Sequence, residues 1–119
     1  MGFFTSKSNF PWINLTSIEQ FNAFFDGDDP FFVFKHSTRC SISSMALSRF
    51  ESEYKGDEQI MPLFLDLIRY REVSNFIADK TGVYHQSPQL IFIKNKKVLD
   101  HASHEQINAD KILTTYEKL

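Results

Sequence analysis

Apolar residues along the chain alternate between short continuous runs and sets spaced three or four positions apart. The run Phe31–Lys35 predicts a strand that is buried on both faces. Met61–Leu67 and Gln89–Lys94 predict two further strands, and Trp12–Leu15 predicts a short first one. Because Pro62 has no backbone N–H, its strand is expected either to lie at a sheet edge or to start there.

Two sequence patterns predict where helices begin. Thr16–Glu19 has the form of a capping box, with threonine as the expected N-cap and glutamate three residues later. Ser103–Gln106 has the same form, so we expect it to open a final helix that carries Ile107. Between them, helical spacing of apolar residues predicts a helix from Ile42 to about residue 54.

Another helix is predicted over Arg71–Lys80, and Gly82 is its expected C-cap. Asn95–Lys97 is a short turn, so Val98–Leu99 should pair with the strand before it. The order is then strand, helix, strand, helix, strand, helix, hairpin, helix. This order predicts an α/β three-layer sandwich, in which a central mixed sheet has helices on both faces.

Composition and charge limit the class of protein. The 119 residues are 42% hydrophobic and carry a net charge of −2, which fits one soluble domain over 1–119 with no general attraction to nucleic acid. Residues 1–9 are expected to form a loose arm. No run reaches the roughly 20 apolar residues of a membrane span, and no secretory signal is visible. One cysteine excludes an internal disulfide, and a reducing, cytoplasmic setting is therefore expected. We also expect the protein to be a monomer.

That cysteine, Cys40, stands between a predicted buried strand and a predicted helix. The unpaired N–H groups and partial positive charge of a helix start favour thiolate over thiol, and Arg39 adds a neighbouring cation. A buried, inert cysteine is the alternative. The surrounding serines, threonine and arginine are unlike a core segment, and we therefore expect Cys40 to be a nucleophile.

Ser43 occupies the position at which a C-x-x-C redox motif has its second cysteine. There, the second thiol would release the first from a mixed disulfide. The Ser43 hydroxyl can hydrogen-bond a thiolate, but it cannot resolve a disulfide. The resolving thiol must therefore come from a small molecule, a substrate or another protein.

The segment Lys35–Ser43, KHSTRCSIS, resembles the KHS-x-x-CPIS signature of the YtxJ-type monothiol bacilliredoxins. Ser87–Pro88, the strand after it and the Asn95–Lys97 turn resemble the cis-proline, strand and hairpin of thioredoxin-like proteins. The resemblance implies a thioredoxin-like fold and no tightly bound cofactor. It also implies that Cys40 removes bacillithiol, its co-substrate, from bacillithiolated proteins.

The same resemblance implies roles for further residues. Pro88 would shape the wall of the binding groove, and the backbone of Ser87 would pair with the bound thiol compound. Arg39 would meet the malate carboxylates of bacillithiol. Ser41 departs from the family, which usually has proline there; serine keeps an N–H that can donate to the thiolate, but it makes the turn less rigid.

Two other readings of the sequence remain open. His36 with Cys40, and His101 with His104, have spacings that invite a metal site. Monothiol glutaredoxins share an iron–sulfur cluster between two monomers, but the CSIS of this chain lacks the glycine of their CGFS motif. No second cysteine supports these, and we expect no metal site. The other reading is a redox-inactive thioredoxin-like adaptor or a thiol sensor, which would use the same fold as a binding surface.

Overall fold

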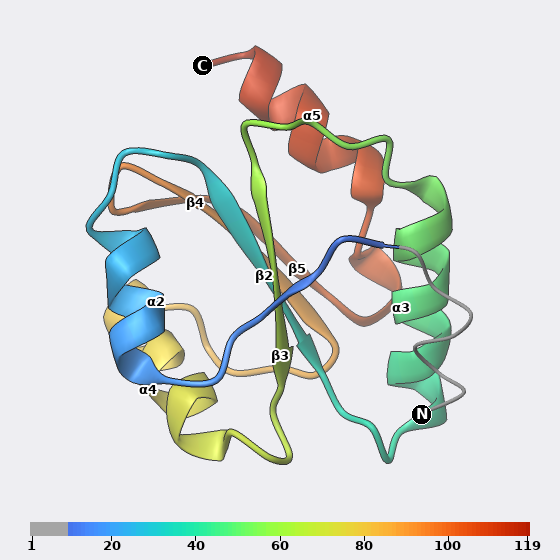
Figure 1. Ribbon diagram of the computed structural model, residues 1–119. Coiled ribbons are helices and arrows are strands. Elements are labelled where there is room, and N and C mark those ends of the chain that lie inside the picture. Colours follow the sequence, from blue (N-terminus) through green and yellow to red (C-terminus); the bar gives the residue numbers. More distant parts are fainter. Residues whose placement is uncertain (1–9) are drawn as a thin grey trace.

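Residues 10–119 form a five-stranded sheet with helices packed on both of its faces (Figure 1). A computed structural model describes residues 10–119; the predicted arm over 1–9 lies outside the described residues. In chain order, the elements are β1 (Ile13–Asn14), α2 (Ile18–Phe25), β2 (Phe31–His36), α3 (Ser41–Glu53), β3 (Met61–Asp66), α4 (Arg71–Thr81), β4 (Gln89–Lys94), β5 (Lys97–Ser103), the 3₁₀ helix η1 (His104–Gln106) and α5 (Ala109–Glu117).

The strand order is β1-β3-β2-β4-β5, which places β2 at the centre of the sheet. β3 runs parallel to both β1 and β2, because a helix crosses over between the strands. β4 pairs with β2 in the antiparallel sense, and β5 returns beside β4 as a hairpin. The predicted mixed sheet and three-layer sandwich are confirmed.

The central strand, β2, contributes side chains to two separate hydrophobic cores. Successive side chains of a strand point to opposite faces. Phe31 and Val33 therefore join the core beneath α2 and α4, while Phe32 and Phe34 join the core beneath α3 and α5. All four are at most 1% exposed, so the prediction of burial on both faces is confirmed. Each such side chain contributes roughly 1.5–3 kcal/mol through burial.

The first capping prediction was wrong by one residue. Ser17, and not Thr16, is the N-cap of α2, and its hydroxyl accepts a hydrogen bond from the N–H of Gln20 at 3.1 Å. The Gln20 side chain reaches back and accepts from the N–H of Thr16 at 2.8 Å. The cap therefore uses the overlapping Ser-x-x-Gln pattern, in which glutamine takes the place of Glu19.

The second capping prediction was also wrong. Ser103 precedes only the short η1 and makes no side-chain capping bond, and His104 has φ +56°, outside the helical region. The final helix begins later, at Ala109, where Asn108 accepts from the N–H of Asp110 at 2.9 Å. Ile107 is therefore buried in the connection before α5 and not in the helix itself.

Two predictions about proline and glycine are confirmed. Pro62 is the second residue of β3, and β1 pairs with β3 only from Leu63 onward. The missing N–H of Pro62 thus falls where a strand start tolerates it. Gly82 ends α4 with φ +74°, the left-handed conformation in which a side chain is strained.

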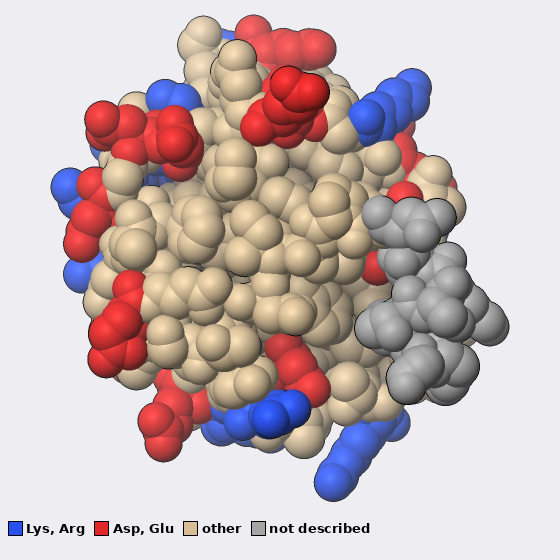
Figure 2. Space-filling view, viewed as in Figure 1, with Lys and Arg blue, Asp and Glu red and all other residues tan. Residues whose placement is uncertain are grey.

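Charged side chains of both signs lie around the rim of the face seen in Figure 2, and uncharged side chains cover its middle. Figure 1 is drawn from the same side, and there the segment that leads into β1 crosses the middle of this face. The aromatic rings of this segment pack inward: Trp12 stacks on Phe50 with centroids 5.9 Å apart, and its Nε1 donates to Glu51 at 2.6 Å. The first strand is thus fastened to α3, the helix that Cys40 precedes.

Candidate functional site

Cys40 is a free, half-buried cysteine in the connection from β2 to α3. It is the N-cap of α3, with φ −113° and ψ 120°, and its side chain makes no capping hydrogen bond. Its backbone is held on both sides, because its N–H donates to Ser37 O at 3.2 Å and its carbonyl accepts from Ser44 N at 3.0 Å. These two bonds fix the backbone of Cys40, whereas its sulfur makes no capping hydrogen bond.

α3 begins directly after Cys40. The first turn of α3 contains no acidic residue, so no carboxylate neutralises the partial positive charge at this helix start. Arg39 and Ser41, the two neighbours of Cys40, are both exposed. Their predicted roles as ligands to the substrate stay predictions, but both residues lie where a molecule that approaches the sulfur can meet them.

Ser43 is fully buried beneath the cysteine loop. Its Oγ lies 2.8 Å from Nδ1 of His36 and accepts a hydrogen bond from the N–H of Ser37 at 3.1 Å. These bonds tie the first turn of α3 to the end of β2. The expected hydrogen bond from Ser43 to the Cys40 sulfur stays a prediction, because the bonds that this structure gives the hydroxyl go to His36 and Ser37.

His36 stood in the sequence as part of the KHS signature and as a candidate metal ligand, and its contact with Ser43 was not expected. It is the last residue of β2, is 3% exposed and packs against the ring of Phe64, with centroids 5.5 Å apart. Burial lowers the pKa of His36, and the opposing field of Asp66 does not cancel this effect. His36 and Ser43 both stand in the Lys35–Ser43 signature, but only the folded strand–helix junction reveals that their side chains are in contact.

The Ser87–Pro88 peptide bond is cis and precedes β4. Lys35 of β2 pairs with Gln89 of β4, and the antiparallel register, continued by one residue, sets Pro88 opposite His36. The sheet thus brings the proline to the strand end from which the cysteine loop leaves. The carbonyl of Pro88 accepts from the N–H of His104 at 3.0 Å, which fixes this segment from its other side.

A buried polar cluster lies on the other face of β2, behind the proline segment. Lys35 is fully buried and its Nζ donates to Ser74 O at 3.1 Å; burial lowers the pKa of Lys35 to about 8. Nδ1 of His85 lies 3.2 Å from Ser74 Oγ, and burial, followed by the charges of Lys35 and Arg71, lowers the pKa of His85. Gln89 donates to Tyr84 O at 2.9 Å, which holds the loop before the proline.

Exposed apolar side chains lie in α3 just after Cys40 and in the loop before the cis-proline. Ile42 and Met45 lie three residues apart at the start of α3 and are 60% and 72% exposed. Tyr84, in the loop that leads to the cis-proline, is 82% exposed. Such side chains offer apolar contact area to a macromolecular substrate.

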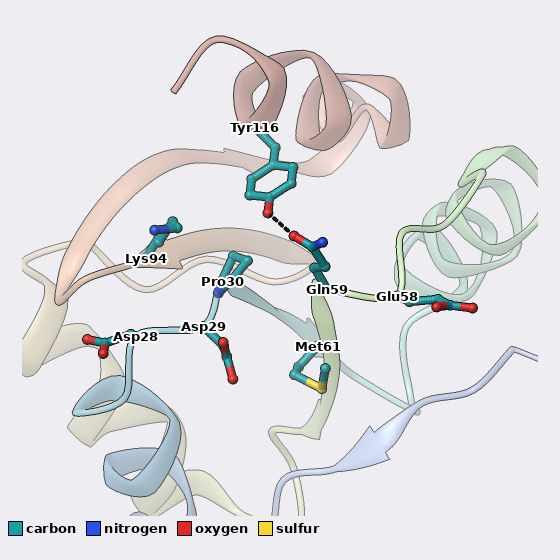
Figure 3. Close-up of a pocket in the computed structure, with 8 residues that line it drawn as sticks. All are labelled: Asp28, Asp29, Pro30, Glu58, Gln59, Met61, Lys94 and Tyr116. Carbon is teal, nitrogen blue, oxygen red and sulfur yellow. Dashed lines mark hydrogen bonds between the residues drawn. The ribbon is translucent and has the colours of Figure 1, made fainter.

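A hollow lies at the end of the sheet opposite to Cys40 (Figure 3). Its volume is about 420 Å³, and it lies where β2 and β3 begin and β4 ends, whereas Cys40 follows the end of β2. Figure 3 shows the carboxylates of Asp28, Asp29 and Glu58 pointing in different directions, with no common centre. Within residues 10–119, no group of three or more His, Cys, Asp or Glu side chains is arranged to hold a metal ion.

Comparison with solved structures identifies the fold. A protein described as having a thioredoxin fold, with a provisional assignment as an oxidoreductase, is 30% identical; the match covers 88% of this chain and 93% of that one, with a TM-score of 0.77. The thioredoxin of Malassezia sympodialis is 17% identical over 91% and 92% of the two chains, with a TM-score of 0.70. That of Schistosoma mansoni is 14% identical over 94% and 98%, with a TM-score of 0.65.

The sheet order, the cis-proline and the cysteine at the start of α3 define a thioredoxin-like thiol protein. The family model of the monothiol bacilliredoxin BrxC matches residues 13–112. The chain belongs to this family, which confirms the resemblance seen in the sequence. None of the helices in the described part of the chain has the length and apolar character needed to cross a membrane.

Proposed function

We propose that this protein is a thiol–disulfide oxidoreductase that removes bacillithiol from mixed disulfides on oxidised proteins. The observation that carries the proposal is the position of Cys40, half-buried at the start of α3 in a chain that has no second cysteine. Membership of the monothiol bacilliredoxin family supports bacillithiol as the external thiol. A reducing, cytoplasmic compartment would supply that thiol, and the protein would act there as a monomer.

The reaction has two exchange steps. First, the Cys40 thiolate attacks the bacillithiol sulfur of the mixed disulfide. A disulfide forms between Cys40 and bacillithiol, and the substrate protein leaves as a thiolate that takes up a proton. Second, the thiolate of another bacillithiol attacks the bacillithiol sulfur on Cys40, which releases the Cys40 thiolate and bacillithiol disulfide. Ser43 cannot take part in this second step, so the external thiol is obligatory.

The residues around the sulfur serve these steps in different ways. The N–H of Ser41 and the hydroxyl of Ser43 donate hydrogen bonds to the thiolate. The exposed Arg39 meets the malate carboxylates of bacillithiol. The backbone of Ser87 pairs with the bound thiol compound, and the cis peptide of Pro88 forms the groove wall beside it.

The test is transfer of bacillithiol to the intact chain. A protein that carries a bacillithiol mixed disulfide is mixed with the reduced chain, and the masses of both are followed. We expect the mass of one bacillithiol to appear on the chain and to vanish when free bacillithiol is added. The Cys40→Ser variant should show no mass increase, because its hydroxyl is not a competent nucleophile at neutral pH.

A matched substrate that carries glutathione determines which thiol is used. Faster transfer from the bacillithiol substrate supports the proposal, and equal or faster transfer from glutathione assigns a different co-substrate. No transfer from either, under conditions that reduce a control disulfide, would overturn the oxidoreductase assignment. That outcome would favour the adaptor or thiol sensor.

A further inference from the structure

His104 has a backbone conformation that glycine adopts without strain and other residues adopt rarely. Its φ is +56°, in the left-handed region. Among residues 10–119, the other residues besides glycine with positive φ are Asn95 and Lys96, which form the two-residue turn between β4 and β5. Such a turn requires left-handed backbone at both positions. His104 lies outside any hairpin turn, where β5 passes into η1, so its conformation has a different cause.

The bonds around His104 hold this conformation in place. Its N–H donates to the carbonyl of Pro88 at 3.0 Å, and its carbonyl accepts from the N–H of Ile107 at 3.3 Å. Ile107 is buried, and its own carbonyl accepts from the Arg49 guanidinium of α3 at 2.9 Å. Strained residues that their surroundings fix in this way cluster where proteins bind ligands or carry out chemistry. The conformation of His104 therefore points to a role for its side chain.

The imidazole of His104 takes no part in these bonds. Within residues 10–119, it forms no hydrogen bond and no ion pair, and the residue is only half-buried. It also belongs to no group of side chains that could hold a metal ion in this part of the chain. A neutral imidazole has one N–H donor and one acceptor nitrogen, so both are available to a bound molecule.

His104 stands at the end of the sheet near which Cys40 lies. The register of the sheet, continued by one residue, places Pro88 between His36, the last residue of β2, and His104. Cys40 follows His36 in the connection to α3, and η1 packs beside this same helix (Figure 1). A thiol compound that meets Cys40 with its sulfur and pairs with the segment before Pro88 would therefore extend toward His104.

We propose that His104 is a specificity-determining residue, whose imidazole donates a hydrogen bond to a malate carboxylate of bacillithiol bound at Cys40. This inference rests on the proposed function and deepens it, because it adds a contact to the part of the compound that other thiols lack. Malate has two carboxylates. Arg39 belongs to the loop after β2 and His104 follows β5, so the two residues approach them from different strands. The fixed backbone of His104 reduces the entropy that is lost on binding.

The first test looks for this contact in the unaltered protein. Cys40 is loaded from bacillithiol disulfide: its thiolate attacks one sulfur, a mixed disulfide forms with Cys40, and one bacillithiol leaves as a thiolate. The ring resonances of isotope-labelled His104, assigned with His104→Ala, are recorded by NMR before and after loading. We expect them to shift with bacillithiol and to stay unchanged when mercaptoethanol, which has no carboxylate, is loaded from its own disulfide. Unchanged resonances with bacillithiol, or equal shifts with both compounds, would overturn the proposal.

The second test separates the imidazole from the strained backbone that holds it. His104→Gly removes both, whereas His104→Ala removes the imidazole and keeps a side chain at positive φ. Transfer of bacillithiol from a modified protein should slow roughly fivefold in each variant, the effect of one lost hydrogen bond. In urea unfolding, the glycine variant should be the more stable of the two. A slower transfer in only one variant would assign the effect to the backbone, and an unchanged rate in both would remove the contact.

Lys96→Gly is the matched control. Lys96 has φ +62° in the hairpin turn, at the end of β4 away from Pro88, so glycine relieves the same kind of strain there. This variant should gain stability in urea and transfer bacillithiol at the unaltered rate. Alkylation of Cys40 by iodoacetamide, which has no carboxylate, should be equally fast in all of these proteins. Slower alkylation in the His104 variants, or slower transfer in Lys96→Gly, would contradict the proposal.

These outcomes separate the inference from the proposed function. The first test needs only that bacillithiol can be attached to Cys40, and not that this protein removes it from other proteins. If transfer fails while the ring of His104 responds to bacillithiol, the contact stands and the oxidoreductase assignment is wrong. If transfer succeeds while neither test shows an effect of His104, the enzyme stands and the contact is wrong.

Discussion

The Nζ of Lys35 in β2 donates a hydrogen bond to the backbone carbonyl of Ser74 in α4, across 3.1 Å. This lysine is fully buried in the central strand of the sheet. Burial lowers its pKa from 10.5 to about 8, because an ammonium group is poorly solvated there. At neutral pH, the protonated Lys35 therefore places a poorly solvated charge in the interior of the folded protein.

Replacement of this lysine should alter how stability depends on pH. Between about pH 8 and pH 10.5, the unfolded chain holds a proton on Lys35 that the folded protein has released. The free energy of unfolding should therefore rise with pH across this window, by about 3 kcal/mol in total. Lys35→Met should lose this rise, as measured by urea unfolding at a series of pH values. Lys118→Met, at an exposed site, is the control; equal slopes in all three proteins would contradict the assignment.

Loss of the exposed cation beside the cysteine should slow reaction with an anionic thiol compound. We expect Arg39→Gln to reduce the rate of bacillithiol transfer roughly fivefold, as is typical for loss of a solvent-exposed ion pair. Lys55→Gln removes the same charge near the far end of α3 and is the matched control. A similar reduction in both variants would indicate a general effect of net charge and not contact with Arg39.

The proline that the family usually has after the cysteine should fit into this chain. Ser41 is the first residue of α3, where proline is favoured, and Cys40 already has the extended φ of −113° and ψ of 120° that a residue before proline prefers. We expect Ser41→Pro to stabilise the fold by about 0.5 kcal/mol in thermal or urea unfolding. Ser44→Pro is the contrast: it removes the bond from Ser44 N to Cys40 O and should cost about 3 kcal/mol.

The glycine after α4 should resist substitution. Gly82 has φ +74°, so Gly82→Ala should cost about 1 kcal/mol, although no atom lies within 4 Å of the added Cβ. Gly27 has no such backbone constraint, and an added Cβ there would meet backbone oxygens at an ordinary 3.5 Å. We therefore expect Gly27→Ala to be neutral or slightly stabilising. Equal losses in urea unfolding for both variants would rule out backbone conformation as the cause.

The fold was largely predictable because its central strand and its helix ends carry strong local signals. The run around Phe32 has no polar residue before its end, and burial on both faces follows from this. Gly82 was predictable as a helix end because glycine tolerates positive φ, and Pro62 as a strand start because proline has no backbone N–H. The errors came where two signals competed: Ser17 and Thr16 both suit an N-cap, and only the position of the Gln20 side chain decides between them.

The site was predictable only in part, since motifs describe neighbours in sequence. Cys40 and Ser43 lie within one turn, and their spacing is visible in the chain. The contact of Ser43 with His36 depends on how β2 meets α3. The burial of Lys35 ran against its residue type, because a charged side chain at the end of a strand is usually exposed. Such contacts follow from tertiary packing and leave no local pattern.

The two outer strands determine how this sheet behaves toward other chains. β1 offers only Ile13–Asn14 for pairing, which is too short to template a further strand. β5 has an irregular register opposite Phe92 and Ile93, and it carries charged side chains, one of which pairs with Lys111 of α5 at 3.4 Å. Both borders of the sheet therefore oppose strand addition, so crowded copies of this protein should not grow into cross-β assemblies from the folded state.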